Sequence, residues 1–100
     1  MVLRVALRVE RGLSSVRVEF VGFPRELAAV AAREVDARRL ADVFARLEAD
    51  HPSLARMCFS EGRLRGGFLV SVNGGRFVTD PATPLDPGDT VILLSADAGG

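Results

Sequence analysis

The sequence contains no lysine, tryptophan or tyrosine, and among its 100 residues it has one cysteine and one histidine. A single cysteine cannot form an intrachain disulfide, and no second cysteine or histidine accompanies it to build a zinc site. We therefore predict no metal site, and we expect Cys58 to be a small buried apolar residue. The lone His51 precedes Pro52 and is expected at a helix end, because no ligand or triad pattern surrounds it.

An excess of charge of either sign is also lacking. Thirteen basic residues, all arginine, balance 13 acidic ones, and no block of like charge occurs. This balance removes the electrostatic signature of a nucleic-acid binder or a polybasic membrane binder, so we expect the partners to be proteins. Every arginine lies at or before Arg76, which leaves the C-terminal quarter acidic.

Long hydrophobic runs are absent as well. The longest ones, such as residues 91–94, are too short for a membrane-spanning helix, and residues 1–4 begin an alternating pattern, not a signal peptide. We expect one soluble, cytoplasmic domain, since 100 residues with 48% hydrophobic content can build one core. No Ser-His-Asp order, glycine-rich phosphate loop or catalytic carboxylate pair can be assembled, so we predict no catalytic residue and no enzyme activity for the chain alone.

Alternation with a period of two marks two strands near the N-terminus. Their apolar positions are Leu3, Val5, Leu7 and Val9 in the first, and Val16, Val18 and Phe20 in the second. The residues between them, 11–15, carry the glycine and serines of a turn, so the two strands could close as a hairpin. Two registers stay open, because residues 1–14 contain either the first strand of the fold or a strand added to it.

From residue 25 to residue 50 the composition turns to Ala, Leu, Arg and Glu. Four apolar side chains fall at i, i+3, i+4 and i+7, the spacing of an amphipathic helix: Leu40, Val43, Phe44 and Leu47. Asp36 is predicted as its N-cap, and Pro52 is predicted to stop it at His51. Residues 27–35 either extend this helix backward or form a short strand.

The C-terminal half predicts further strands. Residues 68–72 form one strand, Asn73-Gly74 a tight turn, and residues 76–78 the partner strand. Residues 90–94 are apolar or β-branched, which predicts a central strand buried on both faces. Strands, a helix and then strands, with the last one central, indicate a compact α+β roll.

The last six residues carry only small side chains and end in Gly99-Gly100, so we expect a flexible, extended tail. The C-terminal half resembles that of the MoaD/ThiS family of ubiquitin-like sulfur carriers, on residues 70–74, residues 83–94 with their Asp-Pro-Gly-Asp motif, and the terminal Gly-Gly. Residues 18–27 and 40–52 resemble the first strand and the helix of the MoaD branch. The family pattern does not require residues 1–14.

The resemblance implies a β-grasp fold, in which a mixed sheet packs on one main helix. The implied parts are an N-terminal extension at residues 1–14, a domain at residues 15–94 and a reactive tail at residues 95–100. An E1-like enzyme of the MoeB or ThiF type would adenylate the Gly100 carboxylate with ATP, and a sulfur nucleophile would convert it to a thiocarboxylate. The chain itself would bind no cofactor.

The resemblance also implies what the tail and the domain surface do. Ala98, Gly99 and Gly100 would thread the active sites of the partner enzymes, because residues without bulk let the backbone approach closely. The MoaD branch implies molybdopterin as the destination of the sulfur, with the large subunit of molybdopterin synthase as the acceptor. Phe77 is the candidate for an apolar partner contact, with an ordinary core position as the alternative. Asp86 and Asp89 are expected to form a turn, not a ligand site.

Other functions compete with this one. The activated Gly100 could be transferred to a lysine of a target protein, as in a ubiquitin-like modifier. Because the chain has no lysine, it cannot build lysine-linked chains on itself. Thiamin, cysteine or a specialised metabolite could replace molybdopterin as the destination. A plain interaction module of the same fold is a third possibility.

Overall fold

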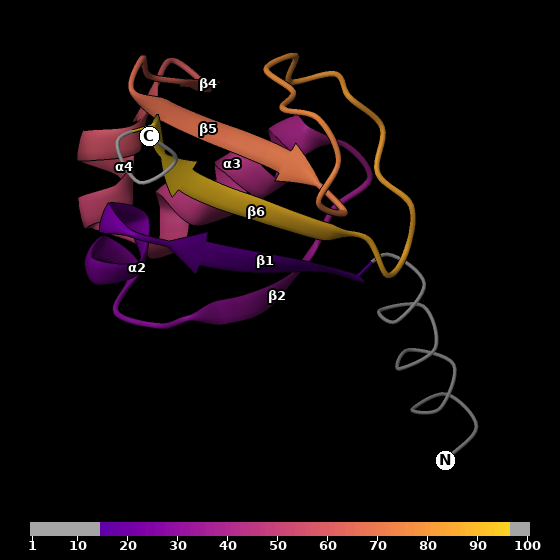
Figure 1. Ribbon diagram of the computed structural model, residues 1–100, viewed down its shortest axis with the longest axis horizontal. Helices are drawn as coiled ribbons and strands as arrows, with labels where there is room; N and C mark the ends of the chain where they lie inside the picture. Colours follow the sequence, from indigo (N-terminus) through magenta and orange to yellow (C-terminus); the bar gives the residue numbers. More distant parts are fainter. Residues whose placement is uncertain (1–14, 97–100) are drawn as a thin grey trace.

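The computed structural model describes residues 15–96, which form a four-stranded sheet with helices packed against one of its faces (Figure 1). The elements are β1 (Ser15–Val21), α2 (Phe23–Ala28), β2 (Ala32–Asp36), α3 (Leu40–Asp50), α4 (Pro52–Cys58), β3 (Phe59–Ser60), β4 (Arg63–Leu64), β5 (Phe68–Val72) and β6 (Thr90–Ser95). The strand order is β2-β1-β6-β5, with β1 parallel to β6 and the other neighbours antiparallel, while β3 and β4 pair separately. This is the predicted β-grasp arrangement.

The position of β1 decides between the two N-terminal registers. β1 pairs with β2 along one edge and with β6 along the other, so both of its edges are occupied. A hairpin between residues 1–9 and residues 16–20 would need one of those edges, and that register is therefore wrong. β1 is the first strand of the β-grasp sheet, and residues 1–14 themselves lie outside the described residues.

The ambiguous stretch after β1 resolves into a short helix and a strand. α2 begins with Pro24 in its first turn, a position where the missing N–H costs nothing. Ala29 ends it in the left-handed conformation, with φ at 64°, and β2 follows three residues later. Residues 27–35 therefore do not extend α3 backward. None of the helices in residues 15–96 is long and apolar enough to cross a membrane.

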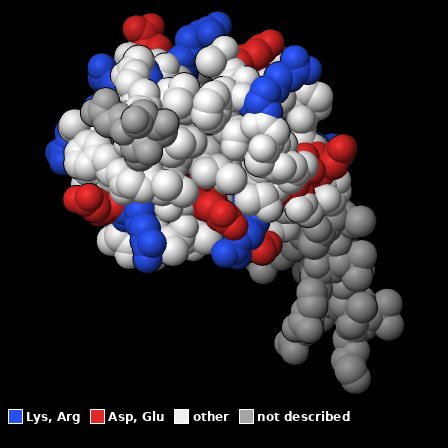
Figure 2. Space-filling model, in the orientation of Figure 1, with Lys and Arg blue, Asp and Glu red and all other residues white. Residues whose placement is uncertain are grey.

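The sheet has one buried face and one open face. The inner face meets the helices and supplies much of the core: Val16, Val18, Phe20, Val35, Val70, Val91 and Leu93. The prediction that β6 is buried on both faces is wrong, because Ile92 and Leu94 on the outer face are half-buried. Figure 2 shows the outer face, where uncharged side chains dominate the middle and most charged ones lie toward the margins.

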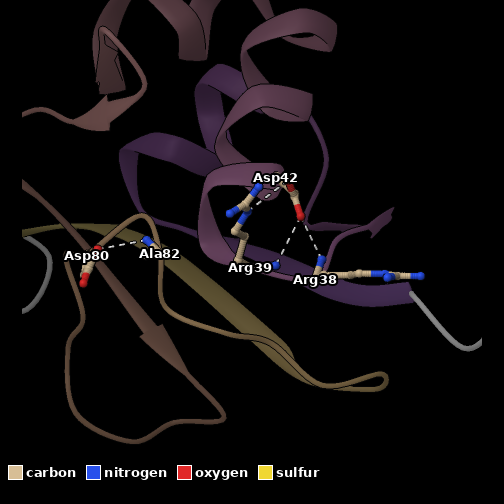
Figure 3. A network of polar contacts seen from close by, with 5 residues as sticks. All are labelled: Arg38, Arg39, Asp42, Asp80 and Ala82. Carbon is tan, nitrogen blue, oxygen red and sulfur yellow. Dashed lines mark hydrogen bonds and ion pairs between the residues drawn. The ribbon is translucent and has the colours of Figure 1, made fainter.

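The main helix, α3, buries the four predicted side chains against the sheet, namely Leu40, Val43, Phe44 and Leu47. Its predicted N-cap is wrong, since Asp36 is the last residue of β2 and the N-cap position belongs to Arg39. The capping group comes from inside the helix. Asp42 Oδ2 accepts the backbone N–H groups of Arg38, at 3.0 Å, and Arg39, at 3.2 Å (Figure 3). This is the reach-back half of a capping box.

The end of α3 is as predicted, but a second helix begins at once. α3 ends at Asp50, and Pro52 opens α4, which buries Leu54 and Cys58. Proline suits the first turn of a helix as well as it stops the preceding one. Cys58 is fully buried, as predicted, and burial raises the pKa of its thiol to about 11. A thiol with so high a pKa is a poor nucleophile.

Candidate functional site

The residues expected to react or to thread partner active sites, Ala98, Gly99 and Gly100, lie outside the described residues. The structure does describe the base from which they extend. Ser95 pairs with Phe68 at the end of β6, and the next backbone N–H, that of Ala96, donates to the carbonyl of Gly67 at 2.8 Å. Since β6 is also hydrogen-bonded to β1 on its other side, the sheet fixes the point where the terminal residues begin.

The opposite end of β6 is held by the two turns of the resemblance motifs. Asn73 Nδ2 donates to Asp89 Oδ1 at 2.9 Å, and the backbone N–H of Thr90 donates to Asn73 Oδ1 at 2.8 Å. The second Asp89 oxygen accepts the N–H of Asp86 at 2.8 Å. Asp89 therefore joins the 86–89 turn to the Asn-Gly turn, which confirms the prediction that these aspartates form a turn. This clamp sets the register of β5 against β6.

The Asn-Gly turn has the predicted form, but its outgoing arm does not. Asn73 and Gly74 both have positive φ, 55° and 71°, and the N–H of Gly75 returns to the carbonyl of Val72 at 3.0 Å. Residues 76–78 were predicted as a partner strand, yet they make only one isolated bridge, Ser71 with Phe77. The prediction of a strand there is wrong.

Apolar side chains gather on the open face of the sheet near the base of the tail. We call them the outer patch: Val21, Leu69, Phe77, Ile92 and Leu94. The register makes them neighbours, because Leu94 lies opposite Val21 on one side and opposite Leu69 on the other. Ser71, opposite Ile92, bridges to Phe77. The outer patch thus crosses three strands, and Leu94 is two residues from the last described residue.

Phe77 is the most exposed large apolar residue of the described chain, at 54%. The alternative of a core position is wrong, because none of the helices in residues 15–96 covers this side of the sheet. Val21, at the other end of the outer patch, is 43% exposed. At the margin Arg17 and Glu19 form an ion pair of 2.9 Å between half-exposed side chains, which contributes little to stability. An apolar centre with a polar margin is the usual anatomy of a protein-binding surface.

His51 lies beside charged and aromatic side chains at the end of α3. Its Nε2 is 3.2 Å from Nη1 of Arg33, which also pairs with Asp50 at 2.9 Å, and its ring meets Phe20 edge-on at 5.9 Å. Burial, and then the charge of Arg33, lower the pKa of His51 below 6.5. The residue is at a helix end, as predicted. Within residues 15–96 no group of three or more His, Cys, Asp or Glu side chains is placed to hold a metal ion.

Sequence reasoning identified Phe77 but missed the rest of the outer patch. Ile92 and Leu94 were predicted to be buried, and Leu69 was placed in a strand without a face, since an apolar run gives no sign of which face stays open. The missed signal was the order of the elements. One main helix can cover one face of a four-stranded sheet, so alternate residues of β5 and β6 must face outward.

Comparison with known proteins agrees with this architecture. A model of the ThiS family matches residues 18–100. Among solved structures, the HVO 2177 protein of Haloferax volcanii is 29% identical over 89% of each chain, with a TM-score of 0.71. Small archaeal modifier protein 1 of Methanosarcina acetivorans is 22% identical over 88% of this chain and 98% of its own, with a TM-score of 0.73.

One further solved structure contains a protein in complex with its partner. It is the complex of subunits 1 and 2 of molybdopterin-converting factor from Helicobacter pylori, 23% identical over 86% of this chain and 99% of that chain, with a TM-score of 0.62. No curated protein matches this chain in sequence. Because the family model covers more than four fifths of the sequence and the β-grasp sheet agrees with it, the chain belongs to the ThiS family of small ubiquitin-like carrier and modifier proteins.

Proposed function

We propose that this chain is a cytoplasmic sulfur carrier whose reactive group is the carboxylate of Gly100. The observation that carries the proposal is a juxtaposition. Central strand β6 leads directly into the segment that ends in Gly99-Gly100, and the same strand forms the middle of the outer patch. A partner enzyme that docks on the outer patch would therefore hold the base of the tail at a fixed distance from its active site.

The chemistry begins with activation, because a carboxylate is a poor electrophile at neutral pH. A carboxylate oxygen of Gly100 attacks the α-phosphorus of ATP on an E1-like enzyme, and pyrophosphate leaves. Hydrosulfide then attacks the acyl carbon and AMP leaves, which gives the thiocarboxylate. If the sulfur comes from an enzyme persulfide, the product is an acyl disulfide, and a second thiol must release the thiocarboxylate. ATP thus serves the activating enzyme, of the MoeB or ThiF type.

Small residues at the end of the chain suit this passage between enzymes. Ala98, Gly99 and Gly100 present at most one methyl group each, so the backbone can enter a narrow channel and approach ATP closely. Ordering such a segment costs conformational entropy, so the binding free energy has to come from the folded domain. The outer patch supplies the apolar area for it, with Phe77 as its most exposed member. The chain is a protein cosubstrate in this scheme, and partners hold the catalytic groups.

Molybdopterin is the proposed destination of the sulfur. The support is the similarity to subunit 1 of molybdopterin-converting factor, a protein that forms a complex with subunit 2. By analogy, Gly100 would enter the active site of the large subunit of a molybdopterin synthase. Thiamin, cysteine and specialised metabolites are the other destinations open to the same thiocarboxylate.

A second candidate function is conjugation of Gly100 to lysines of target proteins. The similarity to small archaeal modifier protein 1 favours it. It shares the adenylation step and differs in the nucleophile, an amine in place of sulfur. Because the sequence has no lysine, a modifier of this kind would attach singly and would not form lysine-linked chains.

The test is mass spectrometry after incubation with a candidate E1-like enzyme, ATP and a sulfur source. Trypsin cuts after Arg76 and releases residues 77–100, which contain neither methionine nor cysteine. A mass gain equal to replacement of oxygen by sulfur, located at Gly100 and dependent on ATP, is the expected result. Oxidation of a sulfur-containing side chain cannot imitate it in this peptide.

The matched control is the chain without Gly100, which keeps the fold and ends in Gly99. It should remain unmodified with the same enzyme and ATP. Recovery of Gly100 in isopeptide bonds, without any thiocarboxylate, would favour the modifier function. Unchanged Gly100 with activating enzymes that load other carriers would contradict both functions and leave the plain interaction module.

A further inference from the structure

The edge strand β2 has backbone groups that no described residue pairs with. β1 occupies one side of β2, and β2 ends the sheet on the other side. The N–H of Phe20 donates to the carbonyl of Ala31 at 2.9 Å, so residues 31, 33 and 35 direct their backbone groups toward β1. By alternation, the backbone groups of Ala32, Glu34 and Asp36 point to the open side. They form a template for one more strand.

A shallow groove lies beside the end of β2, along one flank of α3. Its lining consists of Asp36 from the end of β2 and Asp42, Ala45, Arg46 and Ala49 from α3. The two alanines are exposed and short, so apolar side chains of an added strand would find room above them. An occupant that pairs with β2 could thus bury one of its faces in the groove.

We propose that residues 3–9 of this chain form that occupant, an added strand that pairs with the open edge of β2 and runs parallel to it. The segment has the alternation of a half-buried strand, with Leu3, Val5, Leu7 and Val9 on one side. Those four side chains would cover Ala45 and Ala49. A second copy of the chain and an extended peptide of a partner are the competing occupants.

The connection to β1 favours this segment and sets its direction. Ser15, the first residue of β1, lies opposite Asp36, the last residue of β2. An added strand parallel to β2 would end at the same end of the sheet, and five residues, 10–14, would then connect it to Ser15. Five residues span up to about 17 Å. The crossing covers two strand spacings, about 10 Å. In the antiparallel direction the linker would also have to run back along β2.

Charge agrees with the same placement. When the apolar side chains face the groove, Arg4 and Arg8 face the outer side of the sheet, because they alternate with them. Glu34 lies on that side, exposed and opposite Arg17 in the register. An arginine beside Glu34 is a favourable cross-strand pair. Charged side chains on a new edge also discourage further pairing between molecules.

Amide hydrogen exchange of the full chain, followed by NMR, tests the proposal residue by residue. We expect the N–H groups of Ala32, Glu34 and Asp36 to exchange slowly, like those of Arg33 and Val35. In Leu7→Lys, which places a charge on the groove side, the three outward amides should exchange about 100-fold faster while Arg33 and Val35 stay protected. The matched control is Ala6→Lys on the opposite side, which should leave all five amides protected.

Each other outcome overturns the intramolecular strand. Fast exchange at Ala32, Glu34 and Asp36 in the unmodified chain would mean that the edge is open. Protection that rises with protein concentration would mean that a second copy pairs there. Protection that appears only when another protein is added would mean that β2 receives a partner's peptide. Unchanged protection of the three outward amides in Leu7→Lys would mean that a different group covers the edge.

Discussion

The two faces of the sheet are built from the same strands and differ in what covers them. Along β6, Val91 and Leu93 are 1% exposed beneath the helices, whereas Ile92 and Leu94 are only half-buried on the other side. Apolar side chains therefore occupy both faces of the central strand, although folding covers only one. The difference shows that β6 carries more apolar surface than the core uses, and this surplus is the reason to propose a binding surface on the open face.

The largest expected effect is a loss of stability when a side chain on the inner face is truncated. Leu93→Ala removes a fully buried side chain and leaves a cavity, which should lower the free energy of unfolding by about 2–5 kcal/mol. Leu94→Ala, one residue along the same strand, should cost less than half of that, because solvent already reaches the site. Urea unfolding measures the free energy of unfolding of both variants, and the two can be compared when their m-values are equal. Equal losses would contradict the assignment of Leu94 to the open face.

The clamp at Asp89 keeps the two faces distinct, because a register slip of one residue would exchange them. Asp89→Ala removes two hydrogen bonds, one to Asn73 and one to Asp86, and should lower the free energy of unfolding by about 1–2 kcal/mol. Asp80→Ala is the control, since that carboxylate accepts one hydrogen bond from the N–H of Ala82 within a single loop (Figure 3). Its cost should be smaller in the same unfolding measurement.

A feature could be predicted from the sequence when the residues that form it lie close together in the chain. The apolar face of α3 and its stop at Pro52 depend on neighbours within a few positions, and both were predicted correctly. The N-cap was not, because the capping group is Asp42, inside the helix. The two edges of β1 were settled only by its pairing with β2 and with β6, and its partners in β6 lie 73 positions later in the chain (Arg17 with Thr90).

The same distinction holds for the candidate site. Gly99 and Gly100 are visible as candidates in the sequence because the role proposed for them depends on their small size. The exposure of Phe77 is different, since an apolar residue near a turn is compatible with either face until the coverage of the sheet is known. The resemblance therefore implied the chemistry proposed for the tail, and only the sheet topology identified the surface beside it.

On the open face, the expected effect concerns binding more than stability. Phe77→Ala should weaken binding to the activating enzyme about tenfold, equal to about 1.4 kcal/mol, because the side chain is the most exposed part of the outer patch. The free energy of unfolding should change by less than about 1 kcal/mol. Met57→Ala on α4, 45% exposed and away from the sheet face, is the control for loss of exposed apolar area. Equal effects of both variants on binding would remove the outer patch as the docking surface.

The smallest expected effect is a dependence of stability on pH. It comes from His51, whose ring contacts Phe20 at the margin of the inner face. Burial and the nearby Arg33 lower the pKa of His51 in the folded state, against a weaker opposing effect of Asp50. As the pH falls below about 6.5, the unfolded chain therefore takes up a proton before the folded chain does, and stability declines. Above that pH the histidine is neutral in both states and contributes no pH dependence.

Two variants separate this response from general acid denaturation. His51→Gln should flatten the decline of the melting temperature between about pH 7 and pH 5, whereas the unmodified chain loses stability over that interval. Arg33→Gln should raise the pKa of the His51 imidazole in an NMR titration, because it removes the neighbouring positive charge 3.2 Å from Nε2. An unchanged pKa in Arg33→Gln would leave burial as the sole cause of the shift. An equally steep decline in His51→Gln would assign the acid sensitivity of the fold to its carboxylates.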